Sequence, residues 1–317
     1  MLFDKYRAII TTIVVVIASV FLCVSAHAET KVGVIIPELR APFKIIFDNV
    51  VEGVDDELGK HVPQLILDKK YDSIDIAHWV QEENLNAVIT LGRLGQIASI
   101  YVPPNIAVVN GALLSASSDT NRYPAIALTP DPRALIDLLH RLDNKRKKVI
   151  VVYNPSNNQW LVDLAKRHAE RNGAQLVAYK ATDIKQAAII YDEIFSGNGL
   201  DDTALWLLQD SKVVDSKVVL PFILENAWQK NIVVFSSALG HVKKGVLFSM
   251  YPDNKSHGRQ LARLLEKIQA NPSKAGNEMC PTTGLQQAIN SRTAEHLGLD
   301  LSRSELREFD VVFPVSN

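Results

Sequence analysis

The chain has 317 residues, a formal net charge of −1 and 47% apolar residues. A nearly neutral chain has no electrostatic signature of nucleic-acid binding, and this apolar content is enough for one or two hydrophobic cores. The only dense basic run, residues 145–148, precedes an apolar strand and is predicted to be a solvated loop.

The first 28 residues have the pattern of a secretory signal peptide. Lys5 and Arg7 form a basic region, an apolar stretch runs from Ala8 to Val24, and Ala26-His27-Ala28 has small residues at the positions that signal peptidase recognises. We therefore predict cleavage after Ala28 and export to the periplasm. The alternative is an uncleaved anchor in the inner membrane, because the apolar stretch approaches the roughly 20 residues that span a bilayer.

Strand and helix patterns alternate along the next part of the chain. The expected strands are 32–36, 64–67, 87–91 and 106–109, and the expected helices are 43–58, 73–83 and 96–101. Gly92-Arg93-Leu94-Gly95 lacks the first Gly-x-Gly pair of a dinucleotide-binding loop and is interpreted as a tight turn. Such alternation is typical of βαβ units in a parallel sheet with helices on both faces. One α/β lobe is predicted.

A second alternating series follows a polar loop, residues 115–124, which we interpret as a domain boundary. Its expected strands are 125–128, 149–152, 175–179, 204–208, 232–235 and 246–248, and its expected helices are 132–142, 183–195, 213–229 and 256–269. The tail is predicted to contain a loop over 271–284, a short helix over 291–297, a capped turn at Ser302 and a strand over 311–313. The fold class is therefore α/β, with a second lobe.

The stretch from Val149 to Trp160 combines a buried strand with a helix start. Four β-branched residues from Val149 predict a strand covered on both faces, and Ser156 with Gln159 has the spacing of a capping box. This junction would lie at the carboxyl end of a parallel strand, where helix N–H groups can meet a ligand. Ser156 therefore either caps its own helix or also faces a ligand.

Motifs of catalysis and metal binding are missing from the sequence. There is no His-Glu-x-x-His pair, no Gly-x-Ser-x-Gly nucleophile elbow and no phosphate-binding Gly-Lys loop. The histidines are isolated and are interpreted as surface or helix-end residues, and Cys280 would have no disulfide partner after cleavage at Ala28. We expect no enzyme activity, no metal site and no cofactor.

Four stretches stand in a characteristic order: Val149–Asn157, Leu205–Asp210, Gly258–Ala262 after Tyr251, and the tail Ile289–Leu299. In this order and spacing the chain resembles the type I periplasmic binding proteins of ABC importers. The resemblance is to the ABC transporter substrate-binding family that includes aromatic-amino-acid binders, and it covers most of the exported chain.

The resemblance implies two doubly wound parallel-sheet lobes joined by crossing strands, with the ligand enclosed between them. Residues 29–124 with about 252–285 would form lobe 1, and residues 125–251 with about 286–317 would form lobe 2. The implied partners are a small-molecule ligand and an ABC permease or other inner-membrane protein. Neither nucleic acid nor a second copy of the chain is expected, so the protein would be a monomer.

The resemblance also implies which residues face the ligand. Asp210 could bind a ligand's ammonium group, or it could only cap a helix that begins near Val213. Aromatic residues such as Phe43 or Tyr251 would cover an apolar part of the ligand. The complete set of implied ligand residues is Glu38, Gly92, Arg93, Asn110, Asn154, Ser156, Asn157, Asp210, Ser236 and Ser237.

Two segments depart from the family pattern. Gly92-Arg93-Leu94 replaces a Gly-Thr-Pro turn, and Asn121-Arg122-Tyr123-Pro124 replaces an Asn-x-Thr-Gly segment at the first crossing. Arg93 would either clamp an acidic ligand or remain exposed to solvent. The family's ligand therefore does not transfer automatically to this chain.

The expected function is that of a periplasmic solute-binding protein whose lobes close around a small polar or amino-acid-like molecule. One alternative is a ligand-sensing or regulatory subunit that acts on a membrane partner, and an intact N-terminal helix would favour it. The other is a periplasmic enzyme, which would need an acid–base pair that the sequence does not offer.

Overall fold

The computed structural model describes residues 30–113, 122–272 and 276–315. From Val32 onward the chain forms one compact unit. The predicted signal sequence and most of the predicted boundary loop lie outside the described residues. Within the described ranges, no helix combines the length and apolar character needed to cross a membrane.

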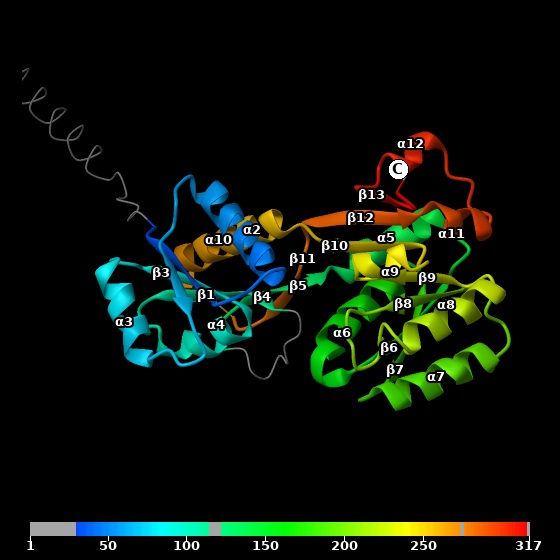
Figure 1. Ribbon diagram of the computed structural model, residues 1–317, viewed down its shortest axis with the longest axis horizontal. Coiled ribbons are helices and arrows are strands. Elements are labelled where there is room, and N and C mark those ends of the chain that lie inside the picture. The colour runs from blue at the N-terminus through cyan, green and yellow to red at the C-terminus, as the bar shows by residue number, and fades with distance from the viewer. Residues whose placement is uncertain (1–29, 114–121, 273–275, 316–317) are drawn as a thin grey trace, which may run out of the picture. The chain divides into compact units, whose positions relative to one another are not determined.

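Two sheets organise the described chain (Figure 1). The first has six parallel strands in the order β11-β5-β4-β3-β1-β2. Their bounds are β1 Val32–Pro37, β2 Gln64–Leu67, β3 Ala87–Leu91, β4 Ala107–Leu113, β5 Ala125–Pro130 and β11 Met279–Thr282. Full burial of β3 and β5 explains why these strands are apolar throughout.

The second sheet has seven strands in the order β13-β12-β10-β9-β8-β6-β7. Only the pairing of β12 with β10 is antiparallel. The bounds are β6 Lys148–Tyr153, β7 Gln175–Lys180, β8 Thr203–Leu207, β9 Val233–Ser236, β10 Phe248–Pro252, β12 Leu285–Asn290 and β13 Val311–Phe313. The two-lobed α/β fold class is therefore confirmed.

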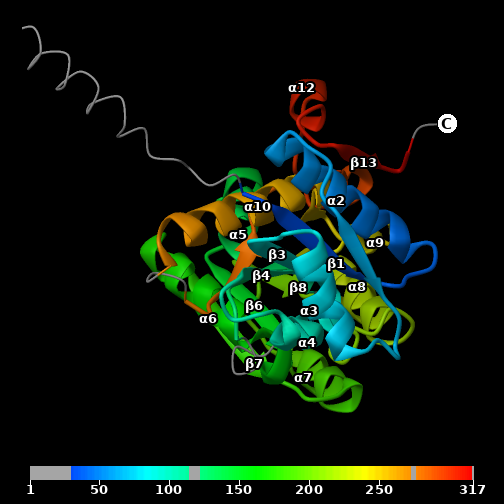
Figure 2. The ribbon, with the colours of Figure 1, turned by 90° about the vertical axis from the view of Figure 1, so that its left-hand side faces the viewer.

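Helices cover both faces of each sheet (Figure 2). On the first sheet, α2 (Phe43–Leu58) and α10 (Asn254–Ala270) share one core, while α3 (Ser73–Glu82) and α4 (Gly92–Ala98) share the other. On the second sheet, α5 (Pro132–Leu142) and α6 (Pro155–Arg171) cover one face, and α7 (Ile184–Ser196) and α8 (Val219–Gln229) the other. The remaining helical segments are η1 (Ser99–Tyr101), α9 (Leu239–Lys243), α11 (Ser291–His296) and α12 (Arg303–Leu306).

The chain passes between the sheets at three places: from β5 to α5, from β10 to α10, and from β11 to β12. The Asp131 N–H donates to the Thr282 carbonyl at 3.0 Å, and the Asp253 N–H donates to the Gly284 carbonyl at 3.0 Å. Backbone bonds therefore tie the third crossing to the other two. The three crossings are therefore joined into one connecting segment between the sheets.

Several predicted elements were wrong in their limits. Gly92–Gly95 is the first turn of α4 rather than a tight turn, and the helix predicted over 213–229 begins at Val219. The predicted loop over 271–284 contains strand β11. Strand β5 belongs to the first sheet, although residue 125 was expected to begin lobe 2. The remaining domain limits stay a prediction.

The basic run over 145–148 is not uniformly solvated, as had been predicted. Arg146 is 9% exposed, and its guanidinium donates to the Asp143 carboxylate at 2.7 Å and to the Asp201 carbonyl at 2.6 Å. Its neighbour Lys145 is exposed. A planar guanidinium can satisfy several acceptors in one buried place, which explains why an arginine occupies this position.

Helices α2 and α10 approach so closely that only glycine fits at two positions. A Cβ at Gly258 would lie 1.9 Å from the Val50 carbonyl oxygen, and a Cβ at Gly53 would lie 1.9 Å from that of Lys255. Ion pairs flank this contact. In one of them the Arg263 guanidinium donates to both carboxylate oxygens of Glu57, at 2.7 and 2.8 Å. The glycine pair therefore sets the separation of the two helices over the first core.

We predict that Gly258→Ala destabilises the protein by about 2 kcal/mol or more, because the new methyl group forces two helix backbones apart. Urea unfolding of the chain from residue 29 onward measures the change. Gly240→Ala in α9 is the matched control, since a Cβ there meets no atom within 4 Å. Equal unfolding midpoints for the two variants would contradict the predicted packing.

Candidate functional site

The carboxyl ends of β6, β8 and β9 lie next to one another in the second sheet. Four of the predicted ligand residues lie here: Asn154, Ser236 and Ser237 directly follow or end β6 and β9, and Asp210 comes shortly after β8. All four are buried, with exposed fractions of 7% or less. Parallel strands bring their carboxyl ends to one edge, so this sheet edge gathers residues that are far apart in the sequence.

The helix that follows β6 begins differently from the prediction. Its cap is Asn154, whose side-chain oxygen accepts the Ser156 N–H at 3.1 Å, and Pro155 occupies the first helical position. The predicted capping box of Ser156 and Gln159 is therefore wrong, because Gln159 accepts the Tyr153 hydroxyl at 2.8 Å instead. The Ser156 side chain is exposed and has no capping role.

Asp210 is held by amide donors at this edge. One of its carboxylate oxygens accepts from the Asn158 side chain at 3.0 Å and from the Asn157 side chain at 3.4 Å. The other accepts the Lys212 N–H at 3.0 Å. These fixed donors compensate for the burial of a charged group and hold the carboxylate in one orientation.

The helix-cap interpretation of Asp210 is wrong, because α8 begins only at Val219. The Asp210 backbone carbonyl instead closes a turn by accepting the Val213 and Val214 N–H groups at 3.1 and 2.8 Å. Asn158 was missed by the sequence analysis. The consecutive amides Asn157 and Asn158, in the first turn after a buried strand, could have indicated it, but only Asn157 was predicted to face the ligand.

The two serines after β9 already have partners inside the protein. The Ser237 hydroxyl accepts from the Trp206 indole at 3.1 Å, and Ser236 Oγ lies 3.1 Å from the Leu207 carbonyl and 2.8 Å from His241 Nδ1. Burial lowers the pKa of His241 to about 4, and the Lys244 charge adds to the effect. Ser236 therefore contacts a neutral imidazole at ordinary pH.

The predicted residues of the first sheet are more dispersed. Glu38 and Arg93 are exposed, whereas Gly92 is buried at the start of α4 with a φ of 70°. A Cβ at Gly92 would lie 3.2 Å from the ring of Phe47. Glycine is needed there both for the left-handed backbone and for the close ring.

Asn110 lies inside β4 rather than after the strand, which ends at Leu113 and not at Val109 as predicted. It is 1% exposed, and its side-chain oxygen accepts the Thr90 hydroxyl at 2.6 Å. Its side-chain nitrogen has no partner within the described part of the chain. A buried donor without a partner is uncommon in folded proteins, so it marks this strand end as a place where a polar acceptor could be accommodated.

The end of β4 is also tied to α10 by a buried histidine. A register shift between Gly111 and Leu113 frees the N–H of Ala112, which has a φ of 54°, and this N–H donates to His257 Nε2 at 3.1 Å. His257 lies at the start of α10, one of the helix-end positions expected for the histidines, but it is 0% exposed and not at the surface. Burial lowers its pKa to about 3, so the folded protein holds it neutral.

We predict that acid weakens the fold through His257. The unfolded chain binds a proton near pH 6.5 and the folded chain does not, so stability falls as the pH decreases below 6.5 towards 3. The slope from this group is about 1.4 kcal/mol per pH unit. Urea unfolding at several pH values should show a flatter profile for His257→Gln than for the wild type.

The matched control for this experiment is His78→Gln, since the His78 side chain is 68% exposed. Its pH profile should follow the wild type. A profile for His257→Gln that is as steep as that of the wild type would contradict the buried neutral state.

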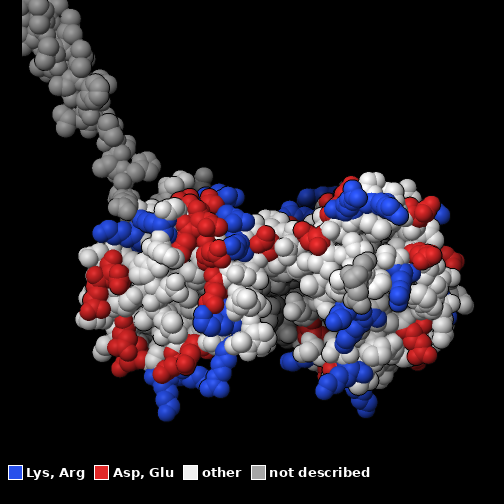
Figure 3. Space-filling view, turned by 45° about the horizontal axis from the view of Figure 1, so that its top comes forward, with Lys and Arg blue, Asp and Glu red and all other residues white. Residues whose placement is uncertain are grey.

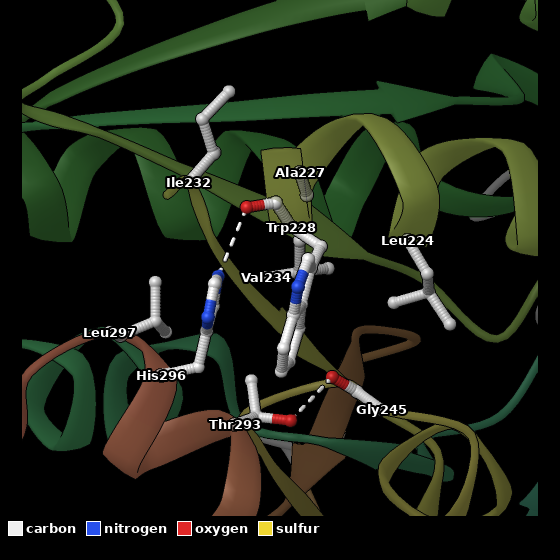
Figure 4. A pocket seen from close by; sticks show the side chains of 9 residues that line it. All are labelled: Leu224, Ala227, Trp228, Ile232, Val234, Gly245, Thr293, His296 and Leu297. Carbon is white, nitrogen blue, oxygen red and sulfur yellow. Dashed lines mark hydrogen bonds between the residues drawn. The ribbon is translucent and has the colours of Figure 1, made fainter. Parts of the chain in front are cut away.

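The cavity in Figure 4 is too small for a solute. Its volume is about 20 Å³, and the rings of Trp228 and His296 stack beside it with centroids 3.5 Å apart. A larger cavity of about 870 Å³ lies among α6, α10 and β11, and none of the ten predicted ligand residues lines it. Within the described ranges, no group of three or more His, Cys, Asp or Glu side chains could hold a metal ion.

Two α/β lobes joined by three crossings, with buried polar groups at the strand ends, define the two-lobed fold of type I periplasmic binding proteins. The sequence profile described as ABC transporter substrate binding protein matches residues 133–310. The chain belongs to this family, which is a family of binding proteins, and the resemblance inferred from the sequence is confirmed.

Three solved structures have a similar fold. An ABC domain in complex with L-Trp from Streptococcus pneumonia has 16% identity, covers 90% of this chain and 100% of its own, and gives a TM-score of 0.54. A conserved domain protein from Vibrio cholerae has 19% identity, coverages of 90% and 99%, and a TM-score of 0.51.

The third structure is a ligand-free, open substrate binding protein with adhesive properties from Clostridium difficile. It has 18% identity, covers 89% of this chain and 99% of its own, and gives a TM-score of 0.61. At sequence identities this low, the similarity concerns the fold alone. No curated protein matches the sequence.

Proposed function

We propose that the protein is a periplasmic solute receptor of an ABC importer that encloses a small amino-acid-like molecule between its lobes. The single observation that carries the proposal is the fixed Asp210 carboxylate at the carboxyl edge of the second sheet, within the residues that match the family. An oriented, partly desolvated carboxylate favours a cationic group such as an ammonium. Family membership supports the coarser role of a substrate-binding protein.

Other groups at the strand ends would receive the rest of the ligand. The exposed Ser156 hydroxyl offers a donor for a carboxylate, and the helix dipole at the start of α6 adds to this attraction. On the first sheet, the Asn110 side-chain nitrogen, which has no partner among the described residues, would be a further donor. Contacts from both lobes exist together only when the lobes are closed, so the ligand would shift the equilibrium towards closure.

The nature of the ligand is suggested by chemistry and by one structure of similar fold. Phe43 is 59% exposed at the start of α2, and an aromatic side chain there could cover an apolar group. The similar structure from Streptococcus pneumonia contains L-Trp. Aromatic amino acids are therefore the first compounds to test, followed by other amino acids, purines, sugars and small acids.

We predict that an amino acid at about 100 times its dissociation constant stabilises the protein by roughly 2.7 kcal/mol. A thermal-shift screen of residues 29–317 should detect this as a rise of several degrees in Tm. Asp210→Asn keeps the shape and removes the charge, so it should weaken amino-acid binding by about 10- to 100-fold.

The matched control is Asp192→Ala, since Asp192 is an exposed carboxylate on α7 of the same lobe. It should bind as the wild type does. Unchanged affinity in Asp210→Asn would contradict the ammonium role. A screen without any shift would favour the alternative, a regulatory subunit that recognises a membrane protein.

A further inference from the structure

The cavity of about 870 Å³ has walls from both lobes. Helix α6, which packs on the second sheet, contributes Asp163 and Arg167, while Lys267 of α10 and Glu278 beside β11 come from elements of the first sheet. Of these four residues, each wall therefore carries one cation and one anion. The cavity lies next to the crossings, because Arg133 at the start of α5 also lines it.

None of these four side chains forms an ion pair within the described part of the chain. Arg167, Lys267 and Glu278 have no ion pair or side-chain hydrogen bond there, and Asp163 only accepts from the Gln159 amide at 2.9 Å. The other charged groups of the lining are already neutralised: Arg133 pairs with Asp131, and Arg263 with Glu57. Among the described residues of the lining, the charges without an ion pair are thus one cation and one anion on each wall.

Asp163 and Arg167 do not pair with each other, although both lie on α6. Asp163 and Arg167 are four residues apart on α6, a spacing at which opposite charges commonly pair, yet no ion pair joins them. All four side chains are exposed, so forming a pair across the cavity would require little desolvation. Movement of the lobes changes the distance between the walls, because each wall is rigidly packed on a different sheet.

We propose that the cavity is a closing interface between the lobes, in which Arg167 pairs with Glu278 and Asp163 pairs with Lys267. The pairs form when the walls approach and stabilise the closed form relative to the open form. Exposed pairs are weak, so each shifts the equilibrium by about two- to threefold. This proposal rests on the proposed function only in assuming that the lobes close.

The approach of the walls can be measured without knowing the ligand. Cys280 lines the cavity from β11, and Leu164 lines it from α6. In residues 29–317, where Cys280 is the only native cysteine, Leu164→Cys introduces a second thiol on the opposite wall. The rate of disulfide formation with diamide as the oxidant then reports how often the walls meet.

In this Leu164→Cys background, Arg167→Glu or Glu278→Arg alone should slow disulfide formation about two- to threefold, and the two together should restore the rate. The single-variant effects should shrink in 0.5 M salt, where surface charges are screened. The matched control is Lys166→Glu, since Lys166 is exposed on α6 and does not line the cavity. It should leave the rate unchanged.

The proposal is overturned if the single charge reversals give the same rate of disulfide formation as Lys166→Glu. It is also overturned if the double reversal fails to restore the rate, or if no disulfide forms in low salt. The outcome is independent of the thermal-shift screen, because no ligand is added. If the charge reversals contradict the closing interface while an amino acid still binds, the solute-binding function is unaffected. If the charge reversals support the closing interface while no compound binds, the lobes close but the proposed ligand is wrong.

Discussion

The three crossings between the sheets are the constraint on which the rest of the structure depends. Each lobe has its own cores on both faces of its sheet, so neither needs the other for burial of its apolar residues. The crossings are joined by backbone hydrogen bonds from Asp131 and Asp253 to the β11–β12 segment. The two lobes are thus packed independently and linked through these connections.

Close contacts fix the elements within each lobe. Gly53 and Gly258 let α2 and α10 lie in backbone contact, and His257 fixes the end of β4 to α10. In the other lobe, Arg146 ties the start of β6 to the segments before β8 and β9 through backbone carbonyls. Polar groups at the strand ends are therefore positioned by packed elements and not by loops alone.

Charged side chains act locally in the contacts described above. Acidic and basic side chains are interspersed over the face shown in Figure 3, consistent with a net charge of −1. Where charges are paired, as between α2 and α10, they accompany close packing. In the cavity between α6 and β11, Arg167 and Glu278 have no ion pair within the described part of the chain, and they are the charges that the proposed closing interface would use.

The sequence by itself determined the fold class and most elements, because hydrophobic periodicity and helix caps are local. Asp131 with Pro132 and Ser302 with Glu305 cap helices as predicted, and β2 has its predicted limits. It also led to the family, since the matching motifs occur in a fixed order. Strands β11 and β12 escaped prediction because their partners are distant in sequence and their composition resembles that of a loop.

Only the tertiary structure decided what the polar residues do. Asn154 caps α6 in place of Ser156, Asn158 holds Asp210, and Ser236 and Ser237 are engaged by neighbouring strands. A side chain's partner at a strand end depends on which strands are adjacent in the sheet and on which helix packs above them. Those distances are fixed by long-range pairing, so no local pattern in the sequence contains them.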